Sequence, residues 1–342
     1  MRPVLTHAAH RLWRDRQTLQ LGRTPGRAHV LAGVDPSTRT VLGLLDGSRD
    51  VPQVVAAATT AGFTAQRTHA LLDLLRQAGL LSDADARWPA GVTLADRDRL
   101  APDVLSLALQ HQGAGVPVLV HRDRAAVLVV GAGRVGAPLA ALLAASGVGV
   151  VDIDDAEAAR PTDTAPGGLA QEDVGRPRGP AARERLRRYT PSTRTGPVAH
   201  PDLVVLAPAG RLDEMAVDTL VRGAVPHLLA EVRETVGVVG PLVLPGRTAC
   251  LTCLDHTRTD RDPQWPVMAA QLAIRQRQLP ACDSALAAAV AAQAALQVLT
   301  LLDGALPASV DGSLELALPD WRWRRRSWER HPSCGCHWQQ AS

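Results

Sequence analysis

The sequence predicts an α/β protein with two parts, a small N-terminal module and a larger, mostly parallel sheet with helices on both faces. Three observations support this fold class. Short strand and helix patterns fill residues 1–85, apolar strands alternate with helices from residue 125 onward, and a glycine-rich loop joins the first of those strands to its helix. A chain of 342 residues is long enough for about two domains.

The composition is that of a globular protein, with 46% hydrophobic and 21% charged residues. Only 3% of the residues are aromatic, so the core must be built from Leu, Val and Ala. The net charge of +3 is too small to indicate a nucleic-acid partner by itself. The chain contains no Lys and no Asn, so all 37 basic residues are Arg, which excludes chemistry that needs a Lys Schiff base.

No segment has the pattern of a secretory signal or of a membrane span. Residues 1–16 carry charges every few positions, and glycines and a proline interrupt the apolar window Val127–Ile153. A second apolar stretch, Leu286–Leu302, contains Gln293 and Gln297 and predicts a buried helix. We therefore expect a soluble, cytoplasmic protein with no membrane partner.

Residues 1–85 are typical of a winged helix-turn-helix module. Strand candidates Thr18–Gly22 and Arg27–Val34 flank a Gly/Pro turn, and Asp35, Asp50 and Thr64 are N-cap residues that open three short helices. The third helix, which we expect over residues 65–78, has too few basic residues for a DNA recognition helix, so DNA binding is not expected. Residues 86–124 read as a linker with a connecting helix at 100–110, and residues 125–342 as the sheet domain.

The glycine-rich loop indicates a Rossmann-like, nucleotide-binding type of sheet. Gly131, Gly133 and Gly136 follow the strand Val127–Val130 and open a helix, where backbone N–H groups can face a phosphate. Asp152 lies 21 residues after Gly131, a spacing that suits a carboxylate bonded to a ribose hydroxyl. These residues do not distinguish NAD from ATP or from a site that has lost its ligand.

Two close cysteine pairs predict a structural zinc site that ties the C-terminal segment to the sheet domain. The pairs are Cys250 with Cys253 and Cys334 with Cys336. Two pairs can complete a tetrahedral Zn²⁺ site, whereas one cannot. The alternatives are four free buried thiols, or a site in which His256 or His337 replaces one thiolate.

The fifth cysteine, Cys282, lies just before the apolar helix. It is either a small buried hydrophobe or a thiol nucleophile activated by the helix N-terminus.

Beyond the glycine loop, residues 127–342 carry further motifs in a fixed order. These are Asp152-Ile-Asp154, Asp173-Val-Gly175-Arg-Pro177-Arg178, a hairpin from Val236 to Val243, and the two cysteine pairs. Together they resemble the ThiF/MoeB branch of the ubiquitin-activating-enzyme superfamily, whose members adenylate the C-terminus of a small carrier protein. The resemblance implies nucleotide binding by Gly131, Gly133, Gly136, Asp152, Asp154 and Arg178, zinc on the four cysteines, and a homodimer. It also places Cys282 near a position where some members carry an acyl-accepting thiol.

The chain departs from this family where the triphosphate is held. Active members follow the acid pair with Asn-Leu-x-Arg-Gln, whereas this chain has no Asn and reads Arg160-Pro-Thr-Asp163. Ala207-Pro208-Ala209-Gly210 stands where the family has a Mg²⁺-binding Asp, and Arg178 replaces a Lys. Removing one group that stabilises transition-state charge costs a factor of about 10²–10³ in rate. We therefore expect a catalytically degenerate homologue that does not adenylate by itself, and leave open whether ATP or AMP still binds.

A degenerate domain of this kind behind a winged helix resembles a narrower group, the leader-peptide-binding partners of azole-forming cyclodehydratases. That resemblance implies that the N-terminal module binds the leader of a ribosomally made precursor peptide, while a separate YcaO-type enzyme uses ATP. Residues 27–34 would supply the sheet edge and residues 65–78 the groove helix. The competing functions are an active adenylyltransferase, a nicotinamide oxidoreductase and a nucleotide-sensing winged-helix regulator.

Two arginine-rich segments are interpreted as structural. Residues 321–330 are expected to form the last strand, with Trp pointing inward and Arg outward. Residues 183–188 are expected to form a solvated helix face.

Overall fold

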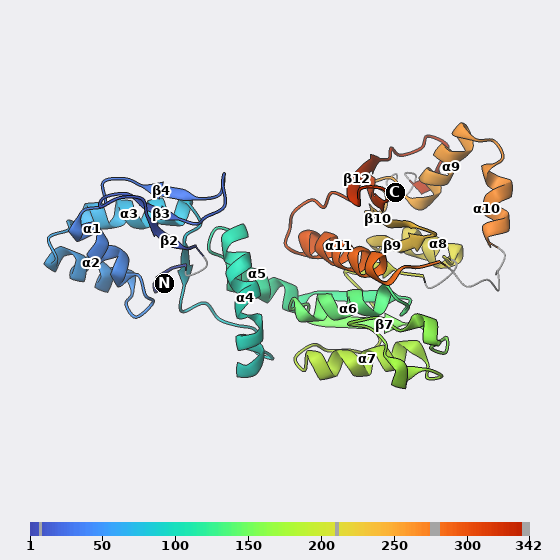
Figure 1. Ribbon diagram of the computed structural model, residues 1–342, viewed down its shortest axis with the longest axis horizontal. Coiled ribbons are helices and arrows are strands. Elements are labelled where there is room, and N and C mark those ends of the chain that lie inside the picture. The colour runs from blue at the N-terminus through green and yellow to red at the C-terminus, as the bar shows by residue number, and fades with distance from the viewer. Residues whose placement is uncertain (7–8, 209–211, 274–280, 337–342) are drawn as a thin grey trace. The chain divides into compact units, whose positions relative to one another are not determined.

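The computed structural model describes residues 1–6, 9–208, 212–273 and 281–336, and it divides into two compact units, Met1–His121 and Arg122–Ser342. In Figure 1 the first unit runs from blue to teal and the second from green to red.

The first unit is made of short strands and helices that follow one another along the chain. They are β1 (Pro3–Leu5), β2 (Arg11–Trp13), β3 (Leu19–Leu21), β4 (His29–Leu31), α1 (Pro36–Leu44), α2 (Val51–Thr60), α3 (Ala65–Gln77), β5 (Leu81–Asp83), α4 (Leu94–Gln110) and α5 (Gly115–Arg124).

The three expected N-caps are confirmed, because each side chain accepts a hydrogen bond from the first turn of its helix. Asp35 opens α1, Thr64 opens α3, and Asp50 forms a full capping box with Gln53 at the start of α2. Strands β2, β3 and β4 form an antiparallel sheet in that order, so β4 is an edge strand. Alternate residues of β3 face the core that this sheet shares with α1–α3.

Three strands of the first unit, β1, β2 and β5, were not expected from the sequence. β1 and β5 pair antiparallel, with Leu5 opposite Leu81 in the same core. Each strand has three residues, too few to show an apolar period, and it is the pairing between distant parts of the chain that forms them. The expected connecting helix at 100–110 is present as α4, which begins earlier because Thr93 caps it.

The second unit alternates strands and helices. Its elements are β6 (Ala126–Val130), α6 (Gly136–Ala145), β7 (Val150–Asp154), 3₁₀ turns at Pro161–Asp163 and Gln171–Asp173, α7 (Arg178–Tyr189), β8 (Leu203–Leu206), α8 (Glu214–Arg222), β9 (His227–Arg233), β10 (Val236–Val243), α9 (Leu251–Arg261), α10 (Trp265–Ala273), α11 (Ser284–Leu302), β11 (Gly312–Ala317) and β12 (Arg322–Ser327).

These strands form a seven-stranded mixed sheet in the order β12-β11-β10-β9-β8-β6-β7. The strands from β7 to β9 run parallel, and β10, β11 and β12 continue the sheet antiparallel. The predicted α/β class and the Rossmann-like sheet are confirmed. The glycine loop leaves β6 in the parallel half, where the carboxyl ends of strands lie beside helix N-termini.

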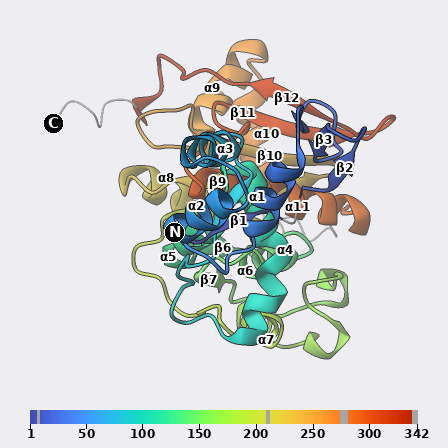
Figure 2. The same ribbon diagram turned by 90° about the vertical axis from the view of Figure 1, so that its left-hand side faces the viewer.

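Helices cover both faces of the sheet. α6, α7 and α11 pack with alternate residues of β6–β9, and α8 with the start of α9 packs against the other face. In Figure 2, α8 and α11 lie on opposite sides of the sheet. Among the described helices, α11 is the one long and apolar enough to cross a membrane, and more than half of that stretch is buried inside the unit, as predicted for a core helix.

The last strand follows the expected alternation only in part. Trp323 packs against the core and Trp328 is buried, but Trp321 precedes β12 and is half exposed. Arg325 is exposed, as expected, and its guanidinium donates to the backbone carbonyls of Ala308 and Val310.

Arg122 forms a buried, two-pronged ion pair with Asp303, at 2.7 Å from Nε to Oδ1 and 2.6 Å from Nη2 to Oδ2. Replacing Arg122 removes the two-pronged cationic partner of this buried carboxylate. We therefore expect Arg122→Met to lower the free energy of unfolding by about 3–5 kcal/mol, measured by urea denaturation of the full chain. The double variant Arg122→Met/Asp303→Leu should lose less than the single variant, and a greater loss would contradict this account.

Candidate functional site

The glycine loop is packed tightly against the end of the neighbouring strand. Gly131 has φ +101°, and a Cβ there would lie 2.1 Å from the carbonyl oxygen of Ala207, just after β8. A Cβ on Gly136 would lie 1.9 Å from the carbonyl oxygen of Gly131. Close backbone packing therefore already requires two of the three predicted glycines, and Gly133 is buried between them.

Asp152, the predicted ribose ligand, lies within β7 and is 2% exposed. Its carboxylate accepts two hydrogen bonds from Arg183, at 2.6 Å from Nε and 3.1 Å from Nη2, and a third from the N–H of Gly196 at 3.1 Å. This carboxylate therefore holds α7 against β7.

The expectation that residues 183–188 form a solvated face is wrong for two arginines. Arg183 is bound to Asp152, and Arg185 contacts Asp173 and Glu172. Hydrogen bonds within this network, above all from the backbone N–H of Ala170 and from Arg185, hold the pKa of Asp173 below its usual value, although burial opposes the shift most strongly. The pattern of the helix alone did not reveal these partners, because they come from other segments.

Asp154 ends β7 and is exposed. Within the described part of the chain its carboxylate makes no hydrogen bond or ion pair. Of the two acids predicted to bind a nucleotide, it alone remains accessible.

A residue that the sequence did not single out, Asp155, lies at the glycine loop. Its carboxylate accepts hydrogen bonds from the N–H of Ala132 at 2.8 Å and from the N–H of Glu157 at 3.0 Å. Arg178, the first residue of α7, contacts the same carboxylate, with Nε 2.9 Å from Oδ2 and Nη2 3.2 Å from Oδ1. In the sequence, only its position directly after the acid pair Asp152 and Asp154 pointed to this residue.

Arg178, predicted to meet a phosphate, is instead surrounded by carboxylates. Besides Asp155, it pairs with Glu157 at 3.2 Å and Asp163 at 3.3 Å, and its side chain is 7% exposed. Guanidinium groups bind phosphate only where their N–H groups are free to do so. The residues present therefore do not fit the polyphosphate of a nucleotide. The Ala207–Gly210 stretch, expected in place of a metal-binding Asp, lies partly outside the described residues.

Arg134 ties the glycine loop to the start of α11. Its Nε donates to the carbonyl of Thr162 at 2.7 Å, and its Nη1 donates to the carbonyl of Cys282 at 2.7 Å. The Cys282 thiol is half-buried and packs against the core, and burial raises its pKa. A raised pKa disfavours the nucleophilic thiolate, so the arrangement favours the role of a small hydrophobe.

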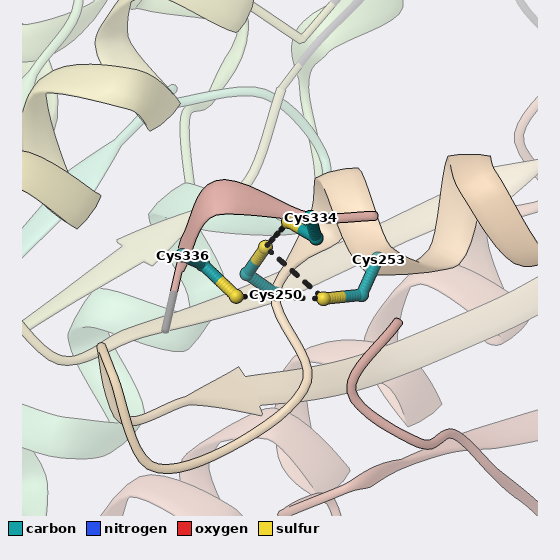
Figure 3. Close-up of side chains that lie close together, drawn as sticks. All are labelled: Cys250, Cys253, Cys334 and Cys336. Carbon is teal, nitrogen blue, oxygen red and sulfur yellow. Dashed lines mark hydrogen bonds between the residues drawn. The ribbon is translucent and has the colours of Figure 1, made fainter. Parts of the chain in front are cut away.

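The four remaining cysteines come together, as the sequence predicted. Figure 3 shows their sulfurs pointing toward one another from the first turn of α9 and from the segment after β12. The Sγ–Sγ distances are 3.6 Å for Cys250–Cys253, 3.6 Å for Cys250–Cys334 and 3.5 Å for Cys253–Cys336. A tetrahedral zinc with Zn–S bonds of about 2.3 Å places its sulfurs about 3.8 Å apart, so the residues fit this metal.

The surroundings of the four thiols favour a closed, structural site. All four are buried, in a small cluster with Val243, Leu254 and Trp328. The hydrogen bond from the Cys250 thiol lowers the pKa of Cys253, which favours a thiolate there, whereas the same contact raises the pKa of Cys250 and burial raises that of Cys336. Without a metal, the four thiols therefore cannot all be ionised together. His256 does not join the cluster, since it stacks on His331 with ring centroids 4.9 Å apart, and His337 lies outside the described residues.

Replacing one ligand should release the metal. We expect one zinc per chain by elemental analysis, and we expect Cys253→Ser to lose it together with several degrees of thermal stability. Cys282→Ser is the matched control and should keep both. Equal zinc content in the two variants would rule out this ligand set.

Comparison with curated proteins finds no match. Similar solved structures include E. coli MccB with MccA-N7isoASN, at TM-score 0.72 and 16% identity over 98% of this chain and 99% of that chain. E. coli MccB with ATP has TM-score 0.70 and 17% identity, over 98% and 99%. PaaA has TM-score 0.69 and 18% identity, over 94% of this chain and 99% of that chain.

At these sequence identities, the structural similarity establishes the fold alone. A sequence model described as the ThiF family matches residues 108–336, about two thirds of the chain. This match covers the glycine loop, the acidic network and the four cysteines. The chain therefore belongs to the ThiF family.

Proposed function

We propose that this protein is a scaffold that binds the leader of a ribosomally made precursor peptide. It would present that peptide to a separate YcaO-type cyclodehydratase or similar enzyme without adenylating by itself. A similar structure is described as the Microcin C7 biosynthetic enzyme MccB in complex with N-formylated MccA, and the likeness spans both units of this chain. This supports a peptide partner.

The observation that carries the binding role is the open edge of β4. Just after β3, the N–H of Gly22 donates to the carbonyl of His10, and just after β2 the N–H of Arg14 donates to the carbonyl of Thr18. Successive residues of the central strand β3 form backbone hydrogen bonds alternately with β2 and with β4. Because Thr18 and Gly22 bond the β2 side, Leu19 and Leu21 bond β4. The N–H and C=O of Val30 therefore point to the open side, where an extended peptide can add as a strand.

Apolar side chains of α3 border the same core as β4. Leu31 of β4 and Leu71 of α3 are both partly buried at the border of the same core. Leu74 lies one turn further along α3 and is 50% exposed. Such side chains suit the apolar residues of an added strand, as in a winged-helix peptide-recognition module over residues 1–85.

The paired charges at the glycine loop support a role without adenylation. Activation of a carboxylate by ATP needs cations and N–H groups that neutralise developing charge. Here Asp152 is held by Arg183, and Arg178 is held by three carboxylates. The second unit would then serve as a dimerising, zinc-bound body in the cytoplasm.

Peptide binding can be tested with a random twelve-residue library displayed on phage and selected on the full chain. A selected peptide is then labelled with fluorescein and titrated by anisotropy. Val30→Pro removes the outward N–H without removing a bond to β3, so we expect affinity to fall about tenfold or more. Val30→Thr keeps the N–H and the branched shape and should bind normally. Equal binding by the Pro variant, or failure to select any peptide, would overturn the peptide site.

The absence of adenylation is tested separately. We expect ATP–pyrophosphate exchange by the zinc-loaded full chain to stay at background, with and without the selected peptide. Exchange above background would favour the competing reading of an active ThiF-type adenylyltransferase, to which the similarity to MccB with ATP also points.

A further inference from the structure

The glycine loop, the start of α7 and the turn after β7 together form a complete anion-binding position. Its donors are the N–H of Ala132 in the loop, the N–H of Glu157 and the guanidinium of Arg178. Backbone N–H groups of a glycine-rich loop combined with an arginine are a donor set that binds phosphate oxygens. In this chain all three donors converge on one carboxylate, that of Asp155.

We infer that Asp155 is an internal anion that occupies the phosphate position of this fold and excludes phosphate-bearing ligands. Its two oxygens take up the donors that a phosphate would need, and its side chain is 5% exposed. The inference rests on the proposed function, because it names the residue that would keep this ThiF-family chain from using a nucleotide. It also implies that a latent site for a nucleoside diphosphate or pyrophosphate lies beneath this side chain.

The backbone of Asp155 is fixed, so the carboxylate is held over the loop. Its carbonyl accepts a hydrogen bond from the N–H of Gly179 at 2.9 Å. A Cβ on Gly179 would lie 2.7 Å from that same oxygen, so α7 packs directly on this turn. A phosphate must therefore compete with a carboxylate whose donors are already in place.

Asp154 provides a matched contrast. It is the same residue type at the next position, and it is exposed, with no partner in the described part of the chain. Removing its charge changes the overall electrostatics by the same amount as removing Asp155, but frees no donor. A gain in ligand affinity that occurs in the Asp155 variants but not in Asp154→Ala therefore shows that the Asp155 carboxylate occupies the phosphate position.

The experiment titrates ADP and inorganic pyrophosphate into the full, zinc-loaded chain by calorimetry at millimolar ligand. We expect wild type and Asp154→Ala to bind weakly or undetectably, and Asp155→Ala to bind at least about tenfold more tightly than either. Glu157 and Asp163 stay paired with Arg178 in this variant, so adding Asp163→Ala should increase the gain.

Asp155→Asn keeps the size and one acceptor oxygen but loses the charge, so it should bind with intermediate affinity. If Asp155→Ala fails to fold, as judged by zinc content and melting temperature, Asp155→Asn takes its place in the titration. Affinity in the Asp155 variants no better than in Asp154→Ala would overturn the inference, as would wild type binding as tightly as Asp155→Ala. Neither result depends on the pyrophosphate-exchange assay, so the inference can fail while the proposed function stands.

Discussion

The contact between Asp155 and Arg178 determines what the glycine loop of the second unit can bind. One carboxylate joins the glycine loop, the turn after β7 and the first residue of α7. Buried charges are stable when they are paired and hydrogen-bonded. Here the charges are paired without any ligand, although the buried Nε of Arg178 makes an ion pair and no hydrogen bond. The same pairing removes the free donors with which a nucleotide-binding sheet neutralises phosphate. Stability of this corner and loss of a phosphate position thus have one cause.

Local signals in the sequence predicted most of the fold. The caps at Asp35, Asp50 and Thr64 and the glycine loop are formed by residues within a few positions of one another, so their chemistry is visible in a short stretch of sequence. The four cysteines were predicted across a long separation because thiols in close pairs have few other uses in such a chain. The short strands β1, β2 and β5 were missed. For β1 and β5, nothing within three residues indicates a pairing partner far along the chain.

The candidate site was predicted less well, for the same physical reason. The sequence identified Asp152 and Arg178 by their place in a motif. Asp152 lies within β7 opposite Leu128, and Arg178 contacts Asp155 beside the loop. Their partners Arg183 and Asp155 were not foreseen, because an ion pair between β7 and α7 leaves no pattern in either element. The motifs therefore identified the region around the glycine loop. Only the side-chain contacts showed that its charged residues are already paired with one another.

The cysteine cluster also bears on the order in which the second unit can be completed during synthesis. Cys250 and Cys253 are made before α11, β11 and β12, whereas Cys334 and Cys336 follow the last strand. A metal ion held by these four thiols would meet the first pair early, but its coordination shell would stay open until the second pair has left the ribosome. Until then the antiparallel half of the sheet relies on strand pairing and apolar packing alone. The metal site would thus be completed only after every strand of the sheet has been translated.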